Sequence, residues 1–357
     1  MKKIEILLRK FLLNLFLLLK RKEKTRTAPN LNGNSNVVII RLNRIGDALT
    51  STPFIRLLKK HCDCNITVVC SKSNHFIFRQ NGLTDNLIVY DKKQNNLAKI
   101  IRAISDINPD LLIDLHDDVS FTVSMLIAFS SAKCKMGFDK KNNKLFNARV
   151  PRPDSKIHHI VDRNLAFADS LGIDYGKDEV NIVYKPDANS VALVENFISK
   201  HGLKKKFLTG INISAGSDAR FWGVERYGKL IDFLSNTFDT KVILLTDKKD
   251  MKKAEEISKG KILIFQDDKF DVFAAMVGSL DFLITPDTSI VHIASAFEIP
   301  LFGLYVKYKT DDIIWYPYKS EYEVVITENP DLSSVDYETV VNKLKPFFER
   351  IYHEKNT

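Results

Sequence analysis

The stretch from Asp281 to Tyr305 constrains the fold more than any other, because it predicts a strand, a tight turn, a helix and a second strand in succession. Phe282–Thr285 is a short, β-prone apolar run, and Pro286 ends it because proline has no N–H to donate to a strand ladder. Ile290–Phe297 then has a helical apolar pattern, and Leu301–Tyr305 is the next apolar run. This order predicts a βαβ unit with two parallel strands.

The turn inside this unit has the composition of an anion-binding site. Asp287, Thr288 and Ser289 are residue types that favour a helix N-cap. The first N–H groups of a helix are free and its dipole is positive there, so a phosphate is favoured at this end. His292 lies one turn beyond Thr288 on the same face and offers a second donor. The alternative is a plain βαβ unit with a capped helix and a surface histidine.

Short apolar runs alternate with helical patterns along most of the chain. The predicted strands are Asn36–Leu42, Ile66–Cys70, Leu87–Tyr90 and Leu111–Leu115, then Leu208–Ser214, Val242–Thr246, Ile262–Phe265, Phe282–Thr285 and Leu301–Tyr305. This alternation predicts an α/β protein with two doubly wound parallel sheets. We place the domains at 36–185 and 186–352, with a last amphipathic helix at Val335–Tyr352.

The positive charge of the chain is concentrated at its N-terminus. The net charge is +9, but residues 1–26 contain nine Lys or Arg and two Glu and so carry +7 of it. The remainder is close to neutral, unlike a body with a broad nucleic-acid-binding surface. We therefore expect a local partner for the N-terminus and no nucleic-acid partner.

The same N-terminal segment is strongly apolar. Ile4–Leu19 is mostly Leu, Ile and Phe, and five Lys or Arg follow at 20–26. Charges interrupt the run, which is too short for a membrane span, and no small-residue cleavage site follows as in a signal peptide. We predict a basic amphipathic helix at 1–28 that lies on an anionic membrane surface, with a linker at 28–35. The alternative is a helix packed on the first domain.

Several function classes lack their sequence signatures. The four cysteines, at 62, 64, 70 and 134, have neither zinc-like nor disulfide-like spacing, so we expect reduced thiols and no metal site. Neither half contains the G-x-G-x-x-G dinucleotide motif or a Walker A sequence. We expect no cofactor.

Asp47 is the first candidate for a catalytic group. It follows Gly46 after the first predicted strand, at the carboxyl end of a parallel sheet, where ligands bind in such folds. A carboxylate there is able to take a proton from a hydroxyl nucleophile. Its alternative role is the N-cap of the next helix. Arg44 in the same turn, and His116 in the acidic stretch 114–118, are candidates for the acceptor side of the site.

A second candidate loop, Ser214–Trp222, follows the first strand of the second half. Ser214 and Gly216 are small, so the backbone is able to approach a ligand closely. Arg220 has the charge to bind a diphosphate and to neutralise a leaving group. The alternative is an exposed loop arginine without such a role.

Three segments, in order, resemble motifs of glycosyltransferase family 9, the lipopolysaccharide heptosyltransferases. They are IIRLNRIGDALTSTPFIRLL, then NISAGSDARFW with ERYGKLIDFL, and TPDTSIVHIASAFEIPLFGLY. The resemblance covers about 36–345. It implies a GT-B fold, with two Rossmann-like domains facing a cleft, and inverting transfer without a metal.

The resemblance also implies roles for single residues. Asp47 corresponds to the catalytic base. The diphosphate ligands would be Arg220, where relatives usually have Lys, with Thr288, Ser289 and His292; the sugar or nucleotide ligands would be Ser214, Gly216 and Asp287. In two places this chain departs from the family pattern: Ser289 replaces a usual Gly, and 246–249 holds lysines where relatives often have Glu.

The implied activity is transfer of a heptose from ADP-heptose to a lipid-A-linked core saccharide, at the cytoplasmic face of the inner membrane. Three alternatives stay open. The chain could be a family 9 transferase with another nucleotide sugar, a nucleotide-sugar epimerase of similar fold, or a non-catalytic nucleotide-sugar-binding protein on the membrane.

Overall fold

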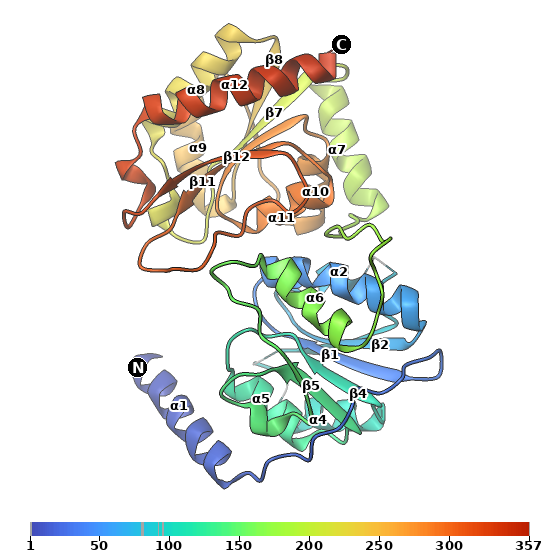
Figure 1. Cartoon of the computed structure of the whole chain (residues 1–357). Helices are drawn as coiled ribbons and strands as arrows, with labels where there is room; N and C mark the ends of the chain where they lie inside the picture. Colours follow the sequence, from blue (N-terminus) through green and yellow to red (C-terminus); the bar gives the residue numbers. More distant parts are fainter. Residues whose placement is uncertain (1, 80–81, 92, 95, 357) are drawn as a thin grey trace. The chain divides into compact units, whose positions relative to one another are not determined.

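The computed structural model describes residues 2–79, 82–91, 93–94 and 96–356 (Figure 1). The chain divides into two compact units, Met1–Val183 and Tyr184–Thr357, close to the boundary expected after residue 185. Each unit is built around one six-stranded sheet in which all paired strands are parallel. The expected α/β class with two doubly wound sheets is confirmed.

The sheet of the first unit has the order β3-β2-β1-β4-β5-β6. Its strands are β1 (Asn36–Arg41), β2 (Asn65–Ser71), β3 (Asn86–Tyr90), β4 (Leu111–Asp114), β5 (Cys134–Phe138) and β6 (Ala148–Val150). Helices α2 (Ile45–Cys62) and α6 (Ile160–Ser170) cover one face, and α4 (Leu97–Asp106) and α5 (Phe121–Phe129) cover the other (Figure 1). The run Val37–Ile40 is completely buried, as expected for a parallel strand with helices on both faces.

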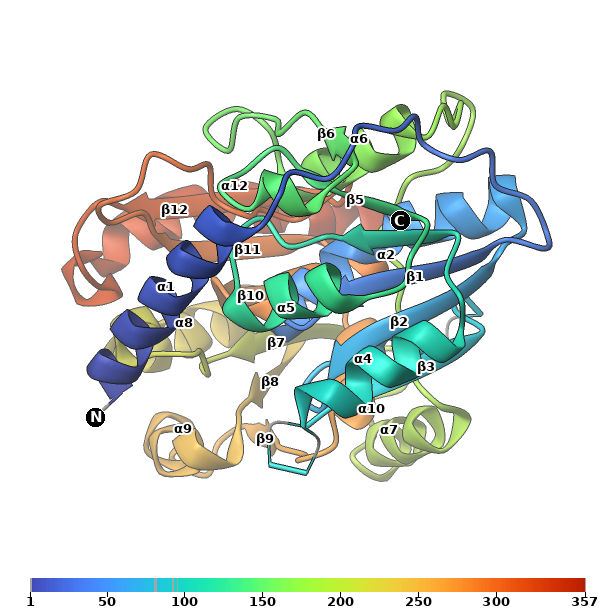
Figure 2. The ribbon, with the colours of Figure 1, turned by 90° about the horizontal axis from the view of Figure 1, so that it is seen from below.

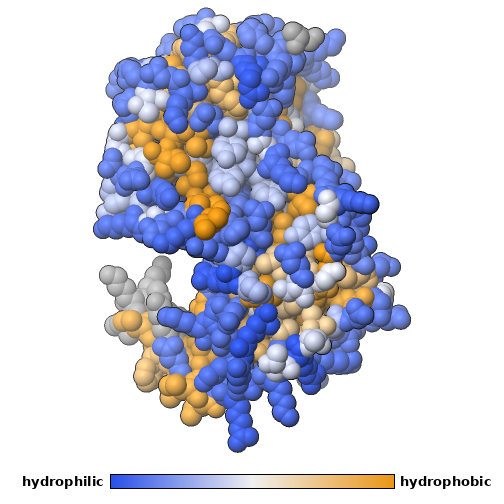
Figure 3. Space-filling model, in the orientation of Figure 1, coloured by the Kyte–Doolittle hydropathy of each residue, from blue (hydrophilic) through white to orange (hydrophobic). Residues whose placement is uncertain are grey.

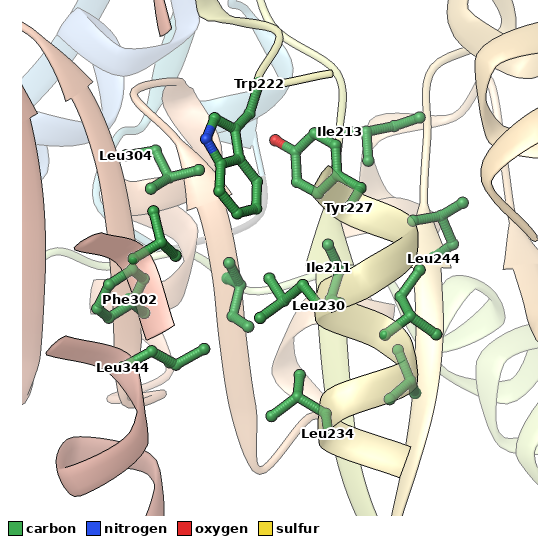
Figure 4. Close-up of a cluster of buried hydrophobic side chains, with 14 of the residues drawn as sticks. Ile211, Ile213, Trp222, Tyr227, Leu230, Leu234, Leu244, Phe302, Leu304 and Leu344 are labelled. Atoms are coloured by element: carbon green, nitrogen blue, oxygen red, sulfur yellow. The ribbon is translucent and has the colours of Figure 1, made fainter. Parts of the chain in front are cut away.

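The sheet of the second unit has the order β12-β11-β10-β7-β8-β9. Its strands are β7 (Phe207–Asn212), β8 (Thr240–Leu245), β9 (Leu263–Phe265), β10 (Phe282–Pro286), β11 (Leu301–Val306) and β12 (Tyr322–Thr327). Its helices are α7 (Ala188–Lys200), α8 (Val224–Thr237), α9 (Met251–Ser258), α10 (Phe270–Gly278), α11 (Ser289–Ala296) and α12 (Tyr337–Asn356). The core between α8, α12 and the sheet is closed by Trp222, whose Nε1 donates to the Val335 carbonyl over 2.9 Å (Figure 4).

Three strands, β5, β6 and β12, were not predicted from the sequence. In β5, Lys135 and Gly137 interrupt the apolar run. A Cβ on Gly137 would lie 2.4 Å from the ring of Phe146, so the close approach of that ring requires glycine. β6 has only three residues, which is too short for a periodic pattern to show.

Helix α1 (Lys2–Leu19) precedes the first sheet and ends earlier than the predicted 1–28. Leu13 and Leu17 are buried against the core of the first unit, and the ring of Phe16 lies 6.0 Å from that of Phe129 on α5. The remaining described side chains of α1 are largely exposed, and apolar atoms gather there in the space-filling view (Figure 3). Among the described residues, no helix has the length and apolar character needed to cross a membrane.

Residues 20–28 are not helical, and they follow the edge of the first sheet (Figure 2). The Glu23 N–H donates to the Lys144 carbonyl over 3.0 Å, and the Arg26 N–H donates to the Asn147 carbonyl over 2.7 Å. The basic segment is therefore attached to the first unit by backbone hydrogen bonds. We call residues 20–28 the leader.

Candidate active site

Asp47 is the third residue of α2, just beyond the carboxyl end of β1. Its side chain is 18% exposed, and its Oδ1 lies 3.5 Å from Asn43 Nδ2. The N-cap position of α2 belongs to Arg44, whose side chain makes no capping bond. The alternative role of Asp47 as N-cap is therefore wrong, and its carboxylate is partly exposed.

Arg41 lies beneath Asp47 and fixes the start of α2. Its side chain is fully buried, its Nε donates to the Asp47 carbonyl over 2.9 Å, and its Nη2 lies 3.6 Å from Asp47 Oδ1. Nη1 donates to the carbonyl of Leu115. Burial lowers the pKa of Arg41, and the charges of Asp47 and Asp114 oppose that change. Arg41, the last residue of β1, therefore connects the residue after β4 to the backbone of Asp47, the proposed base, by hydrogen bonds.

His116 lies in the interior of the first unit, so its expected place on the acceptor side is wrong. The Leu42 N–H donates to Nε2 over 3.1 Å, which leaves the proton on Nδ1 to donate to Asp114 Oδ1 over 2.8 Å. Lys140 also pairs with Asp114 over 2.9 Å. Burial favours the neutral acid, but Lys140 and His116 together hold the pKa of Asp114 well below its usual range. Both ring nitrogens of His116 are hydrogen-bonded, so His116 links the carboxyl ends of the neighbouring strands β1 and β4.

Asp117 forms a second ion cluster after β4. It accepts two hydrogen bonds from Arg152, of 2.8 and 2.9 Å, and it pairs with the buried Arg163. Burial alone would raise its pKa, but the two arginines lower the pKa of Asp117 to about 2. Arg44 is different, because it is exposed and has no ion-pair partner within the described part of the chain. Arg44 is therefore an exposed cation at the start of α2, and its contact with an acceptor stays a prediction.

Arg220 and Asp287 form the centre of the candidate site in the second unit. Arg220 ends the short 3-10 helix η2 (Asp218–Arg220). Its Nη2 lies 2.8 Å from Asp287 Oδ2, and its Nη1 donates to the Asp287 carbonyl over 2.9 Å. Burial raises the pKa of Asp287, and the charge of Arg220 opposes the rise. Arg220 is thus held beyond the end of β10 while remaining one-third exposed.

The start of α11 lies at the same end of β10. Thr288 is its N-cap, and its Oγ1 accepts from the Ile290 N–H over 3.1 Å. Ser289 is half-buried as the first helical residue. His292 is only 3% exposed, and its ring centroid lies 6.0 Å from that of Trp315. The structure therefore places Thr288 and Ser289 at the surface of the turn but His292 in the interior.

The loop after β7 meets the end of β8. Ser214 Oγ accepts from the Asp247 N–H over 2.9 Å. Gly216 is exposed, and the space where a side chain would stand is open, so its backbone is accessible to a ligand. Lys249, in the 3-10 helix η3 (Lys248–Asp250), donates through Nζ to the Ala215 carbonyl over 2.5 Å. A second exposed cation therefore stands at this loop.

Two of these groups, Arg41 and Lys249, were missed as site residues. Arg41 is the last residue of β1, and a single charge at the end of an apolar run was the available signal. Lys249 belongs to the basic stretch after β8, which the sequence showed only as a departure from a family pattern. The contact with Ala215 places it next to the loop that holds Ser214 and Gly216.

The comparison with protein families decides the class of this chain. The model of glycosyltransferase family 9 (heptosyltransferase) matches residues 97–345. The chain belongs to glycosyltransferase family 9. It is therefore a glycosyltransferase.

Similar proteins agree with this assignment. Lipopolysaccharide heptosyltransferase 3 of Escherichia coli is 23% identical over 295 residues, which cover 77% of this chain and 84% of that protein. A family 9 glycosyl transferase from Veillonella parvula superimposes with a TM-score of 0.79 at 21% identity, over 90% of this chain and 99% of that one. The E. coli heptosyltransferase WaaC, solved with ADP, gives 0.68 at 16% identity, over 89% and 99%. The family 9 chain thus has the GT-B fold.

Proposed function

We propose that this family 9 glycosyltransferase transfers a heptose from ADP-heptose to a core saccharide of lipopolysaccharide, with inversion and without a metal. The similarity to lipopolysaccharide heptosyltransferase 3, and to a WaaC structure solved with ADP, supports this donor and acceptor. The observation that carries the proposal is the position of Asp47, a partly exposed carboxylate set at the end of β1 by Arg41.

In this mechanism an acceptor hydroxyl attacks the anomeric carbon of the heptose while its proton passes to the carboxylate of Asp47. The bond from the anomeric carbon to the diphosphate oxygen breaks, and ADP leaves with the electron pair. A single displacement inverts the anomeric configuration. The contacts of Asp47 with Arg41 and Asn43 hold the carboxylate in one place, which reduces the entropy cost of reaching the transition state.

The leaving diphosphate would be stabilised by the second unit. Arg220 supplies a charged donor, Lys249 a second cation, and the start of α11 the positive end of a helix dipole. Ser214, Gly216 and Asp287 would contact the nucleotide or sugar. These groups provide the positive field that a metal ion provides elsewhere, so we expect chelation of metals by EDTA to leave activity unchanged.

We also propose that the enzyme works as a peripheral protein at the cytoplasmic face of the inner membrane. Leu7, Phe11, Leu15 and Leu18 of α1 are between 44 and 73% exposed, and Phe129 of α5 is 59% exposed. Five Lys or Arg follow α1 at 20–26. An apolar helix face beside basic residues is the pattern of a helix that lies in the surface of an anionic bilayer.

The test is Asp47→Asn, because the amide keeps the shape but does not accept the proton. We expect turnover to fall about 10²- to 10⁴-fold, as is typical for loss of a general base, with ADP-heptose affinity within a few-fold of wild type. Asp63→Asn, at the other end of α2, is the matched control and should retain full turnover. Near wild-type turnover of the Asp47 variant would exclude it as the base.

The same assay, run with and without a truncated core acceptor, separates the remaining activities. A transferase releases ADP and lengthens the acceptor only when the acceptor is present. An epimerase alters the nucleotide sugar without an acceptor, and a binding protein does neither. Either of these two results would overturn the proposed transfer.

A further inference from the structure

A small open cavity lies between the leader and the edge of the first sheet, away from Asp47. Its volume is about 230 Å³. It is lined by Thr25, Arg26 and Ala28 of the leader, Met136 of β5, Ala148 and Arg149 of β6, and Ser170 at the end of α6. Pockets for drug-sized ligands span roughly 300–1,000 Å³, so this cavity suits a smaller group.

Two guanidinium groups in this wall lack a counter-charge. Arg149 Nη2 is buried and has no hydrogen-bond partner in the described structure. Arg26 Nη1 donates to the Lys133 carbonyl over 2.9 Å, which fixes the group without neutralising it. Neither arginine has an ion-pair partner among the described residues, and no acidic side chain lines the cavity. Arg149 is half-buried and Arg26 is exposed, so the cavity presents two cations without a paired anion. An anion between them would give the buried Nη2 of Arg149 an acceptor.

The rest of the lining narrows the chemistry of that anion. Ala28, Met136 and Ala148 form an apolar part of the wall, which suits carbon atoms rather than a bare ion. Ser170 Oγ already donates to the Ala166 carbonyl over 2.8 Å, so it has lone pairs left to accept from a ligand hydroxyl. Arginine forks match the oxygen atoms of a phosphate group. A phosphate attached to a small hydroxylated carbon skeleton fits all three features.

We propose that this cavity binds a phosphate monoester between Arg26 and Arg149. The phosphate could belong to a lipid headgroup or to a soluble ester. The lipid source fits the surroundings, because the leader that forms one wall continues directly from α1 and carries exposed Arg21, Lys22 and Lys24. The proposal does not depend on the transfer reaction, so each can fail separately.

The direct test is a titration of the full-length protein with glycerol 3-phosphate, followed by calorimetry. We expect saturable binding by the wild type, and at least tenfold weaker binding by Arg149→Gln and by Arg26→Gln. Arg102→Gln removes an exposed positive charge from α4 of the same unit and should bind within twofold of wild type. Equal binding by all four proteins overturns the proposal, as does an equal loss in the Arg102 variant.

A melting temperature separates binding from a structural role. Because Arg149 Nη2 makes no hydrogen bond, Arg149→Gln should unfold no earlier than wild type without ligand, while glycerol 3-phosphate should raise the melting temperature of wild type only. A large drop without ligand would show that Arg149 supports the fold, which would overturn the proposal.

Vesicles then identify the source of the phosphate. Phosphatidic acid carries a phosphate monoester, whereas phosphatidylserine is anionic but carries a diester. If Arg149→Gln weakens binding only to phosphatidic acid vesicles, the ligand is a lipid headgroup. If it weakens glycerol 3-phosphate binding but leaves both vesicles unaffected, the ligand is a soluble ester.

Discussion

At the residue scale, Arg220 is held in place by its contacts with Asp287, as the proposed diphosphate site requires. Its two contacts with Asp287 hold the guanidinium beyond the end of β10, so little side-chain freedom would be lost when a diphosphate binds. A diphosphate would compete with the carboxylate of Asp287 for the guanidinium donors of Arg220. Burial raises the pKa of Asp287, and the charge of Arg220 opposes that rise.

We expect Arg220→Ala to weaken ADP binding about 10- to 100-fold and to lower turnover, since a hydrogen bond to a charged group contributes about 1.5–3 kcal/mol. Arg220→Lys should keep more activity because it retains the charge. Lys229→Ala is the control, since Lys229 is an exposed cation of the same unit paired with Glu225. If calorimetry finds ADP bound equally by the Arg220 and Lys229 alanine variants, Arg220 does not contact the diphosphate.

At the scale of elements, helix α1 has two faces in different surroundings. Leu13 and Leu17 are 6 and 9% exposed and belong to the core of the first unit, whereas Leu18 is 73% exposed. The burial of Leu13 and Leu17 agrees with a helix packed on the domain, and membrane binding by the exposed face stays a prediction. Deleting residues 1–28 would remove both faces at once, so single substitutions are the sharper test.

Leu17→Ala should lower the free energy of unfolding by about 2 kcal/mol, the lower end of the range for buried leucine truncation. Leu18→Ala should leave stability unchanged and weaken binding to anionic vesicles by up to about 60-fold, since it removes three carbons at about 0.8 kcal/mol each from the membrane. Denaturant unfolding and vesicle sedimentation measure the two effects. Equal vesicle binding by wild type and the Leu18 variant would show that this face does not enter the bilayer.

Elements with strong local patterns were predictable, and features made by distant contacts were not. The strands β1 and β10 were predicted from their apolar runs, because a strand buried on both faces is apolar along most of its length. His116 accepts a hydrogen bond from the N–H of Leu42, and the ring of His292 lies near that of Trp315. Both partners are distant from the histidines in the sequence, so spacing does not reveal them. Spacing shows which face of an element a residue occupies, but not what covers that face.

At the scale of the whole molecule, the two units carry their ionised acids differently. In the first unit, Asp114 and Asp117 lie in partly or fully buried ion clusters with lowered pKa values. In the second unit, Asp218 and Asp336 have lowered pKa values but are exposed. The pKa of the partly exposed Asp187 is lowered by hydrogen bonds from Ser190 and Lys269, and burial raises the pKa of Asp271 and Asp287. Acid should therefore destabilise the first unit more than the second.

Asp117→Asn tests this difference. The folded pKa of Asp117 is about 2 and the unfolded value about 3.9, so its stabilisation is complete above about pH 4 and is lost as the pH falls through 2. Two pKa units correspond to about 2.6 kcal/mol, which partial exposure reduces to about 1–2 kcal/mol.

We expect calorimetry at pH 7 to show that the first unit of the variant unfolds at a lower temperature than that of wild type. This difference in unfolding temperature should disappear near pH 2. Asp106→Asn, at the exposed end of α4, is the control and should change little at either pH. A protonated carboxyl and an amide should behave alike near pH 2. A difference in unfolding temperature that stays constant from pH 7 to 2 would therefore contradict an ionic role for Asp117.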